Sequence, residues 1–417
     1  MLHHPAGTRP SFVIDGDGHY VEPASLWAEY IDPAVRDSLH VLSRGADETT
    51  QVILGEWDVY GLRPGHNNAA IFADTVAAAG DTVQVHWGLG DVLRPGGMKA
   101  GRPANRPLQD AHPAGWSPHE RLRVHDDNGI DAAIVFPTVG MSQGYNPDPT
   151  LAAAACTAIN RWAADYVSAA PDELYAVAAL PWQDPLRAAQ ELRRSVTEHG
   201  FVAGAIIPVP DLDGRRIGDP TRDVLWQTAV ELDVPICIHA ASRADEMLGE
   251  SRVSTVVMKQ AVGHPLENMI AFASLYEARV FERFPSLRIG FMECSCGWVP
   301  FWTERLTEAV ELLGWTLSPS LTRMPDEVFA AQCIVGCEGD ESMVPAVQAR
   351  FGIDSVQWAS DFPHMDTDFP LAEPMLRRTD MTAEQLAGAM CTAAERFYRL
   401  DLDAVRRSHQ RRALVAQ

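Results

Sequence analysis

The sequence contains almost no lysine and carries far more acidic than basic side chains. Its 417 residues include only Lys99 and Lys259, and 34 basic residues stand against 56 acidic ones, which gives a formal net charge of −22. Nucleic acids and anionic membrane surfaces would repel a chain this acidic. We therefore expect neither as a partner.

Long hydrophobic runs are absent as well, and cysteines are few. No stretch reaches 18 uncharged apolar residues, and the N-terminal MLHHPAGTRP lacks the basic-then-apolar order of a secretory signal. The seven cysteines are odd in number and lie mostly in apolar runs, as reduced core thiols do, which argues against a disulfide framework. These absences predict a cytoplasmic protein without a membrane span.

Short apolar runs that alternate with helical patterns indicate the fold class. The predicted strands are residues 12–17, 131–136, 174–180, 202–207, 234–239, 287–293, 332–337 and 355–361. Between most of them apolar residues recur at helical spacing, as in 151–168, 185–197 and 222–231. Eight strand–helix units in one chain predict an α/β fold of the (β/α)8 TIM-barrel class.

A segment rich in Gly and Pro separates the first two predicted strands. It is too long for an ordinary connection, so we expect residues 43–116 to form an insertion between strand 1 and helix 1, serving as a lid or an oligomer contact. The barrel would then comprise residues 8–42 and 117–400. Residues 401–417 would form a C-terminal tail, whose basic cluster RRSHQRR is typical of a frayed end.

Two familiar motifs fail at the end of the first strand. Gly16 and Gly18 begin like a dinucleotide fingerprint, but Val21 occupies the place of its third glycine. A calcium loop beginning at Asp15 would need glycine where Tyr20 stands. Neither nucleotide nor EF-hand calcium binding is therefore predicted.

Acidic and histidine side chains occupy the ends of several predicted strands, where TIM-barrel active sites lie. Asp17 and His19 end the first strand, and His239, Glu293 and Asp361 end the fifth, sixth and eighth. Each alone is compatible with a capping or hydrogen-bonding role. Together they would be costly to bury without a cation, so they predict a divalent metal site, and mixed nitrogen and oxygen ligands suit zinc, manganese or iron.

The first strand allows a more specific expectation, because FVIDGDGHYVEP (12–23) sets three acids and an imidazole almost side by side. Residues two apart on a strand point to the same side, so Asp17 and His19 are expected to face one point. We expect the neighbouring Asp15 and Glu22 to belong to the same wall of the cation's coordination sphere.

Motifs spread over nearly the whole chain resemble one enzyme family. They are VIDGDGHYVEP at the first strand, NGIDAAIVFPT at the second, VPICIHA at the fifth, ERFPSLRIGFMECSCGWVP at the sixth, WASDFPH at the eighth and AAERFYRL near the end. The chain is similar to the amidohydrolase-related (amidohydrolase 2) metal enzymes, in the branch that contains aminocarboxymuconate-semialdehyde decarboxylase and the resorcylate-type decarboxylases.

The resemblance implies roles for individual residues. Asp17-Gly18-His19 stands where the family has His-x-His, His239 takes the place of the fifth-strand metal ligand, and Asp361 that of the carboxylate that binds the metal or acts as general base. The decarboxylases have His-Gly-Gly-Gly after strand six, whereas this chain has Glu293-Cys294-Ser295-Cys296-Gly297. Their catalytic histidine is thus a glutamate here, and their route does not carry over unchanged.

The number of metal ions stays open, at one or two per chain. The larger superfamily bridges two metals with a carbamylated lysine on a strand, but neither lysine of this chain lies on a predicted strand. A second metal would need Glu293 as its bridge, with His264 as a further ligand. His264 precedes Pro265, a candidate first residue of a helix, so it is equally compatible with an N-terminal cap.

Three further residues are candidates for substrate binding. Arg243 follows His239 and could hold a carboxylate, Trp298 could wall the pocket, and His364 either contacts substrate or supports Asp361 from behind. The aromatic side chain of Trp298 is equally compatible with ordinary barrel packing, and Arg243 with a solvated surface position.

These residues favour a metal-dependent enzyme that hydrolyses or cleaves a small carboxylate or carbonyl substrate with a metal-activated water. The alternative from another class is a non-heme di-iron monooxygenase on the same barrel, hydroxylating a carboxylic-acid derivative. A metal-stabilised binding protein is a third hypothesis. The resemblance also implies a homo-oligomer, most commonly a dimer.

Overall fold

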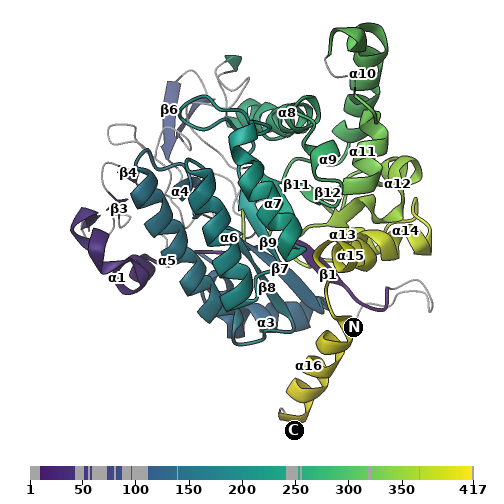
Figure 1. Cartoon of the computed structure of the whole chain (residues 1–417). Coiled ribbons are helices and arrows are strands. Elements are labelled where there is room, and N and C mark those ends of the chain that lie inside the picture. The colour runs from purple at the N-terminus through teal and green to yellow at the C-terminus, as the bar shows by residue number, and fades with distance from the viewer. Residues whose placement is uncertain are drawn as a thin grey trace.

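The computed structural model describes most of the chain, with gaps in and after the region between the first two barrel strands (Figure 1). The described residues are 10–42, 51–54, 57–58, 73–78, 81–86, 95, 111–138, 140–240, 252–253, 256–317, 321–365 and 367–415. None of the helices among them combines the length and the hydrophobicity that crossing a bilayer would require.

Eight strands form one sheet in strict chain order, and every neighbouring pair is parallel. They are β1 (Ile14–Tyr20), β7 (Ala132–Pro137), β8 (Leu174–Ala179), β9 (Ala203–Ile206), β10 (Ile236–His239), β11 (Ile289–Met292), β12 (Cys333–Cys337) and β13 (Val356–Trp358). The strands are almost wholly buried, because helices cover the outer face of the sheet (Figure 1). The TIM-barrel prediction is confirmed.

The barrel closes between its first and last strands through the residues that follow β13. The backbone N–H of Asp361 donates to the carbonyl of Asp17 at 2.9 Å, and the N–H of His19 donates to the carbonyl of Phe362 at 2.8 Å. Gly16 permits the close approach, because a Cβ there would lie 2.9 Å from the Trp358 carbonyl oxygen. The two chain segments that carry predicted metal ligands are therefore bonded to each other.

Helices join and surround the strands. The longer ones are α3 (Pro118–Asn128), α5 (Pro149–Val167), α6 (Pro185–His199), α7 (Asp223–Leu232), α8 (Val256–Glu277), α10 (Trp298–Leu313), α11 (Pro325–Gln332), α12 (Val344–Phe351) and α16 (Leu402–Val415). Shorter ones are α1 (Ala24–Tyr30), α4 (Gly140–Gln143), α9 (Val280–Arg283), α13 (Glu373–Leu376), α14 (Ala383–Ala387) and α15 (Ala393–Tyr398). Local sequence sets their starts: Asp148 and Asp184 accept N–H bonds from the first turns of α5 and α6, each followed by Pro.

The segment between β1 and β7 contains strands outside the barrel. After α1 come β2 (Leu39–Leu42), β3 (Gln51–Leu54) and β4 (Trp57–Asp58) in one antiparallel sheet, and β5 (Ala73–Ala78) pairs with β6 (Asp81–His86). Much of the predicted 43–116 insertion lies outside the described residues. The role of this insertion as a lid or an oligomer contact stays a prediction.

The C-terminal segment is not frayed, in contrast to the expectation for its basic cluster. Helix α16 spans most of it. Arg412 forms ion pairs with Asp126 at 2.9 Å and Glu173 at 2.7 Å, and Arg411 pairs with Asp172 at 2.6 Å. The basic residues thus attach the helix to acidic residues of the barrel domain.

Candidate metal centre

The end of β1 presents two of the predicted ligands to the barrel mouth. The pairing of β1 with β7 shifts register between Asp15 and Gly18, so the strand is irregular where the motif begins. Beyond the shift, Asp17 and His19 are both buried, with 3.6 Å between Asp17 Oδ1 and His19 Nε2. The expectation that these two side chains share one side of the strand is confirmed.

Residues from distant parts of the chain meet this pair. His239 at the end of β10 places its Nε2 atom 3.3 Å from Asp17 Oδ1. Asp361, which follows β13, places Oδ1 3.2 Å from His19 Nε2. Asp17, His19 and His239 form one group with the spacing of metal ligands, each offering an atom within 4.8 Å of the others.

Hydrogen bonds on the far side of each imidazole orient both rings. His19 Nδ1 lies 3.3 Å from the carbonyl oxygen of Pro137, and His239 Nδ1 lies 2.6 Å from that of Ala240. A carbonyl can only accept, so this network assigns the proton of each neutral ring to Nδ1. The lone pair of each Nε2 then faces the shared point, as in metal-bound histidines.

The donor set fits a cation. Asp17 Oδ1, His19 Nε2 and His239 Nε2 are buried and make no hydrogen bond to the described residues, an arrangement that is costly for polar atoms unless another group satisfies them. The mixed nitrogen and oxygen donors suit zinc, manganese or iron. These three residues would hold such an ion, and Asp361 lies close enough to join them.

Charges around the two histidines shift their pKa values in opposite directions. Burial, together with the neighbouring His364 and His239 rings, holds the pKa of His19 well below its ordinary value. Burial also acts to lower the pKa of His239, but the Asp17 carboxylate and, to a smaller extent, the Glu293 carboxylate outweigh it and raise this pKa to about 9. The negative charge that favours a proton on His239 would equally favour a metal ion in its place.

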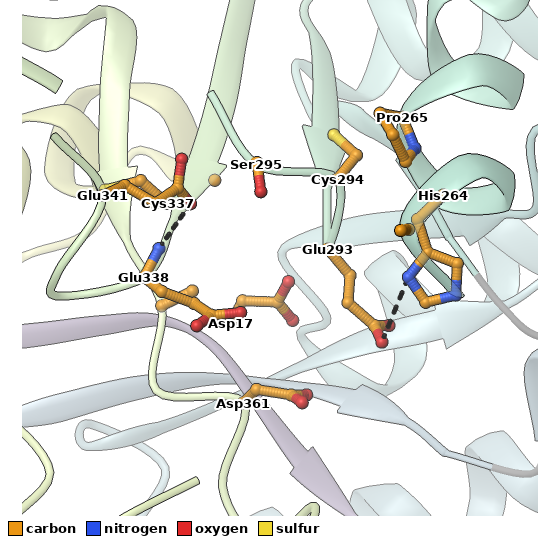
Figure 2. A pocket seen from close by; sticks show the side chains of 13 residues that line it. Asp17, His264, Pro265, Glu293, Cys294, Ser295, Cys337, Glu338, Glu341 and Asp361 are labelled. Carbon is orange, nitrogen blue, oxygen red and sulfur yellow. Dashed lines mark hydrogen bonds and ion pairs between the residues drawn. The ribbon is translucent and has the colours of Figure 1, made fainter. Parts of the chain in front are cut away.

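Glu293 lies beside this cluster and faces a cavity. Its Oε2 atom is 3.3 Å from His239 Nδ1, and its Oε1 atom is 3.8 Å from Nδ1 of His264. Figure 2 shows the Glu293 side chain directed toward His264, with Asp17 and Asp361 on the other side. The cavity has a volume of about 230 Å³ and is lined by Asp17, Ala261, His264, Pro265, Glu293, Cys294, Ser295, Gly336, Cys337, Glu338, Glu341, Ala359 and Asp361.

The cavity lining is strongly acidic. It includes five carboxylate side chains, whereas none of its described residues is Arg or Lys. The Glu341 carboxylate holds the surrounding backbone, because it accepts hydrogen bonds from the N–H groups of Cys296 at 2.7 Å and Glu338 at 2.9 Å. An anionic substrate would therefore need a cation to offset the remaining charges.

Backbone strain is concentrated at the same place. Glu293, Ser295 and Asp361 have φ angles of 51°, 55° and 53°, in the left-handed region that side chains with a Cβ rarely adopt. Glu293 and Asp361 each follow a barrel strand and direct a carboxylate into the cavity. Strained residues of this kind cluster at active sites, which supports a functional role for both.

His364 lies behind Asp361. Its Nδ1 atom is 2.7 Å from Asp361 Oδ1, its Nε2 atom is 3.2 Å from the Thr138 hydroxyl, and its ring stacks on His19 at 4.1 Å between centroids. Of the two roles expected from sequence, the geometry favours support of Asp361.

Asp15 and Glu22 do not join the ligand cluster. The expectation that they help to surround the cation is wrong. Asp15 accepts hydrogen bonds from the backbone N–H of Ser360 at 2.9 Å and from its hydroxyl at 2.5 Å. Glu22 accepts the N–H of Gly140 at 2.8 Å. Asp15 thus holds the segment after β13, and Glu22 holds the start of α4.

Sequence reasoning also missed a fully buried cation, Arg121 of α3. Its guanidinium donates to the carbonyl of His19, to the carbonyl of Phe362 at 3.2 Å and to the Tyr166 hydroxyl at 3.3 Å. It thereby ties the two segments that carry His19 and Asp361. The sequence does not indicate this buried position, because an arginine in an amphipathic helix is usually exposed to solvent.

Other predicted residues have different outcomes. Trp298 packs in the aromatic core against Phe291, at 5.5 Å between ring centroids, and is not among the described residues that line the cavity. Helix α8 runs through Pro265, so the predicted helix start there is wrong and His264 is not an N-terminal cap. Lys259 lies within α8 and not on a strand. Arg243 and Lys99 lie outside the described residues.

The family model described as amidohydrolase matches residues 14–400. One curated relative, 2-amino-3-carboxymuconate-6-semialdehyde decarboxylase from Dictyostelium discoideum, is 26% identical over 62% of this chain and 68% of its own length. A gamma-resorcylate decarboxylase from Rhizobium sp. is 33% identical over 67% of this chain and 86% of its own length. Neither relative is named as an oxygenase.

A solved structure has the same architecture. It is an amidohydrolase from Mycobacterium avium subsp. paratuberculosis, which superposes with a TM-score of 0.70 at 20% identity, over 95% of this chain and 99% of the other. The likeness supports the barrel and extends over nearly all of both chains.

Proposed function

The chain belongs to the amidohydrolase family, and from this premise we propose that it is a metal-dependent lyase that releases the carboxylate of a small carboxylic acid as CO2. The relatives described above are both named decarboxylases. The observation that carries the proposal is the convergence of Asp17, His19 and His239, with unbonded donor atoms, beside the two cavity carboxylates of Asp361 and Glu293.

The metal would be held by Asp17, His19 and His239, with Asp361 adjacent. When bound, a divalent cation supplies positive charge that draws electron density from a substrate oxygen. The protein's own contribution is to fix the ligands in place and to surround the substrate with a small, acidic cavity. Because the described residues of the lining include no Arg or Lys, a bound cation would supply the positive charge that offsets an anionic substrate.

Asp361 is the residue placed best to move a proton. Its Oδ1 atom forms an ion pair with Nδ1 of His364 at 2.7 Å, and the other ring nitrogen of His364 contacts the Thr138 hydroxyl, so the side chain is held in one orientation. In decarboxylation the bond between the carboxylate carbon and its neighbour breaks, CO2 leaves, and a proton takes the vacated position. Asp361 would deliver that proton, since it faces the cavity at hydrogen-bonding distance from the ligand cluster.

Glu293 gives this site a different acid–base partner from that of the decarboxylases it resembles. A carboxylate in the place of their histidine carries negative charge where an imidazole can be neutral or positive. Its Oε2 atom contacts His239 Nδ1 at 3.3 Å. We propose that Glu293 orients His239 and relays protons at the cavity wall.

The direct test follows the fate of the proton. Protein loaded with manganese, zinc or iron would be incubated in D2O with gamma-resorcylate and a panel of small hydroxylated aromatic acids. Decarboxylation predicts CO2 release and one deuterium at the carbon that lost the carboxylate. Substrate cleavage that consumes water without CO2 release would replace the proposal with hydrolysis, and a requirement for O2 would contradict both.

Replacing His239 by Ala is expected to lower metal affinity by at least about 100-fold, because one of three ligands is lost. Metal content after dialysis against a weak chelator, measured by elemental analysis, checks this. The matched control is His119→Ala, since His119 is an exposed histidine of α3. Equal metal retention by the two variants would remove His239 from the site.

A further inference from the structure

Gln357, in the middle of β13, is a buried polar residue that the proposed chemistry does not use. Its side chain is fully buried, in a barrel of the kind whose interior is mostly filled by branched aliphatic side chains. Burying a primary amide costs free energy unless its polar atoms find partners inside the protein. The contacts of this amide therefore indicate what the residue does.

The amide nitrogen of Gln357 contacts β1 at the residue before Asp17. Nε2 lies 2.8 Å from the carbonyl oxygen of Gly16, and since a carbonyl can only accept, this end of the side chain is assigned as the NH2 group. The two residues pack closely, because a Cβ on Gly16 would lie 2.7 Å from Cδ of Gln357. The amide thereby holds the backbone directly before a proposed metal ligand.

This contact lies where β1 departs from regular pairing. The register against β7 shifts between Asp15 and Gly18, so Gly16 and Asp17 belong to an irregular segment of the strand. Irregularities of this kind disrupt the ladder locally and redirect a side chain. A hydrogen bond from the side chain on β13 supplies a constraint that the disrupted ladder lacks. The direction of the Asp17 carboxylate therefore depends on how the Gly16 carbonyl is held.

A second contact of Gln357 extends this support to the strand of another ligand. Nε2 also lies 3.3 Å from the Tyr398 hydroxyl of α15, which in turn lies 3.5 Å from Sγ of Cys237 on β10. Cys237 precedes His239 by two residues, so both side chains point to the same side of β10. These contacts connect the strands that carry Asp17 and His239.

A neutral side chain suits this position. A lysine or arginine in place of Gln357 would compete with the cation for Asp17, and an acid would add negative charge to a buried acidic cluster. An amide donates a hydrogen bond without adding net charge. Burial raises the pKa values of Cys237 and Tyr398, and the Asp17 charge acts in the same direction, as expected for groups close to that carboxylate.

We propose that Gln357 is a positioning residue for the metal centre: its amide holds the Gly16 carbonyl and thereby directs the Asp17 carboxylate toward the other ligands. The inference rests on the metal site of the proposed function and not on the reaction. Without the amide, the irregular segment of β1 would relax. The distance of 3.3 Å between Asp17 Oδ1 and His239 Nε2 would then no longer be fixed.

Replacing Gln357 by Met tests this role, because methionine has a similar length but donates no hydrogen bond. The natural protein and the variant would be titrated with manganese(II) and cobalt(II). Gln357→Met is expected to bind both ions about tenfold more weakly, as variants that lose support for metal ligands do. The visible absorption spectrum of bound cobalt(II) should change as well, since it reports the geometry of the ligands.

Gln348→Met is the matched control. Gln348 of α12 is also a buried glutamine, and its Nε2 atom donates to the backbone carbonyls of Ile353 and Gln385, both at 2.9 Å. Both substitutions should lower the midpoint of urea unfolding, but only Gln357→Met should change metal binding. Tyr398→Phe keeps the test decisive if Gln357→Met does not fold. It removes the second contact of the amide at nearly constant size and should weaken cobalt(II) binding about twofold or more.

The possible results separate this inference from the proposed reaction. Natural affinity and a natural cobalt(II) spectrum in folded Gln357→Met, or in Tyr398→Phe where only that variant folds, would overturn the positioning role. An equal loss of affinity in Gln348→Met would do the same. A natural protein that binds neither ion would overturn the metal centre and this inference together. Metal binding without CO2 release would contradict the decarboxylase activity alone.

Discussion

Replacing Asp361 by Asn is expected to lower kcat/KM by at least about a thousandfold, within the range that a positioned proton-transfer group contributes. The amide is nearly the same size as the carboxylate, so it should keep its place beside His364, whose Nδ1 atom lies 2.7 Å from Asp361 Oδ1. It cannot carry a proton to substrate, however, because an amide does not titrate in water. Steady-state kinetics on a substrate identified by the deuterium assay measure the loss.

Metal content separates the two roles that Asp361 can have. If it acts chiefly as the proton donor, Asp361→Asn keeps its metal and loses turnover; if it is chiefly a ligand, both fall together. Asp127→Asn is the control, because Asp127 is an exposed acid of α3 at 3.4 Å from Arg123. Full activity in Asp361→Asn would exclude Asp361 from the mechanism.

The barrel was predictable because its strands are buried on both faces and therefore read as continuous apolar runs. The predicted strand 174–180 corresponds to Leu174–Ala179, and 332–337 to Cys333–Cys337. The helical pattern 185–197 similarly corresponds to Pro185–His199, whose Asp cap and following Gly200 are local signals. Elements of this kind are specified by residues close together in the chain.

The ligand cluster was predictable for a different reason. In a barrel the strand ends meet at one mouth, so His239 and Asp361 could be placed near Asp17 without knowing any side-chain contact. The sequence could not predict which acids of the first-strand motif face away from the ligand cluster. Alternation placed Asp15 on the same side as Asp17, but the register shift after Asp15 and a partner 345 positions away, Ser360, decide its direction.

The mistaken helix start at Pro265 has a similar origin. Proline is favoured in the first turn of a helix, but it also occurs inside helices, where it removes the hydrogen bond to the carbonyl four residues earlier, here that of Ala261. In α8 the side-chain amide of Asn268 donates to the carbonyl of His264 at 3.0 Å. That contact supports the backbone next to Pro265, and no local sequence rule indicates it.

Arg121→Met is expected to destabilise the protein by about 3 kcal/mol or more, because it leaves buried carbonyls of His19 and Phe362 without their donor. It also removes a positive charge that counteracts the effect of burial on Asp15, whose pKa is raised to about 6. The midpoint of urea unfolding, followed by circular dichroism, measures the stability. We expect metal affinity to fall about 10- to 100-fold as well, since His19 and Asp361 lie on the two segments that Arg121 joins.

A matched substitution on the same helix isolates the buried contacts. Arg123→Met removes an arginine whose side chain is 61% exposed and paired with surface acids, so it should change stability by less than about 0.5 kcal/mol. Metal titrations performed where Arg121→Met is still fully folded distinguish positioning of the ligands from general destabilisation. A folded Arg121→Met variant with unchanged metal affinity would show that the ligands keep their geometry without this guanidinium. The contact of Asp15 with Ser360 and the backbone bonds between β1 and the residues after β13 would then suffice.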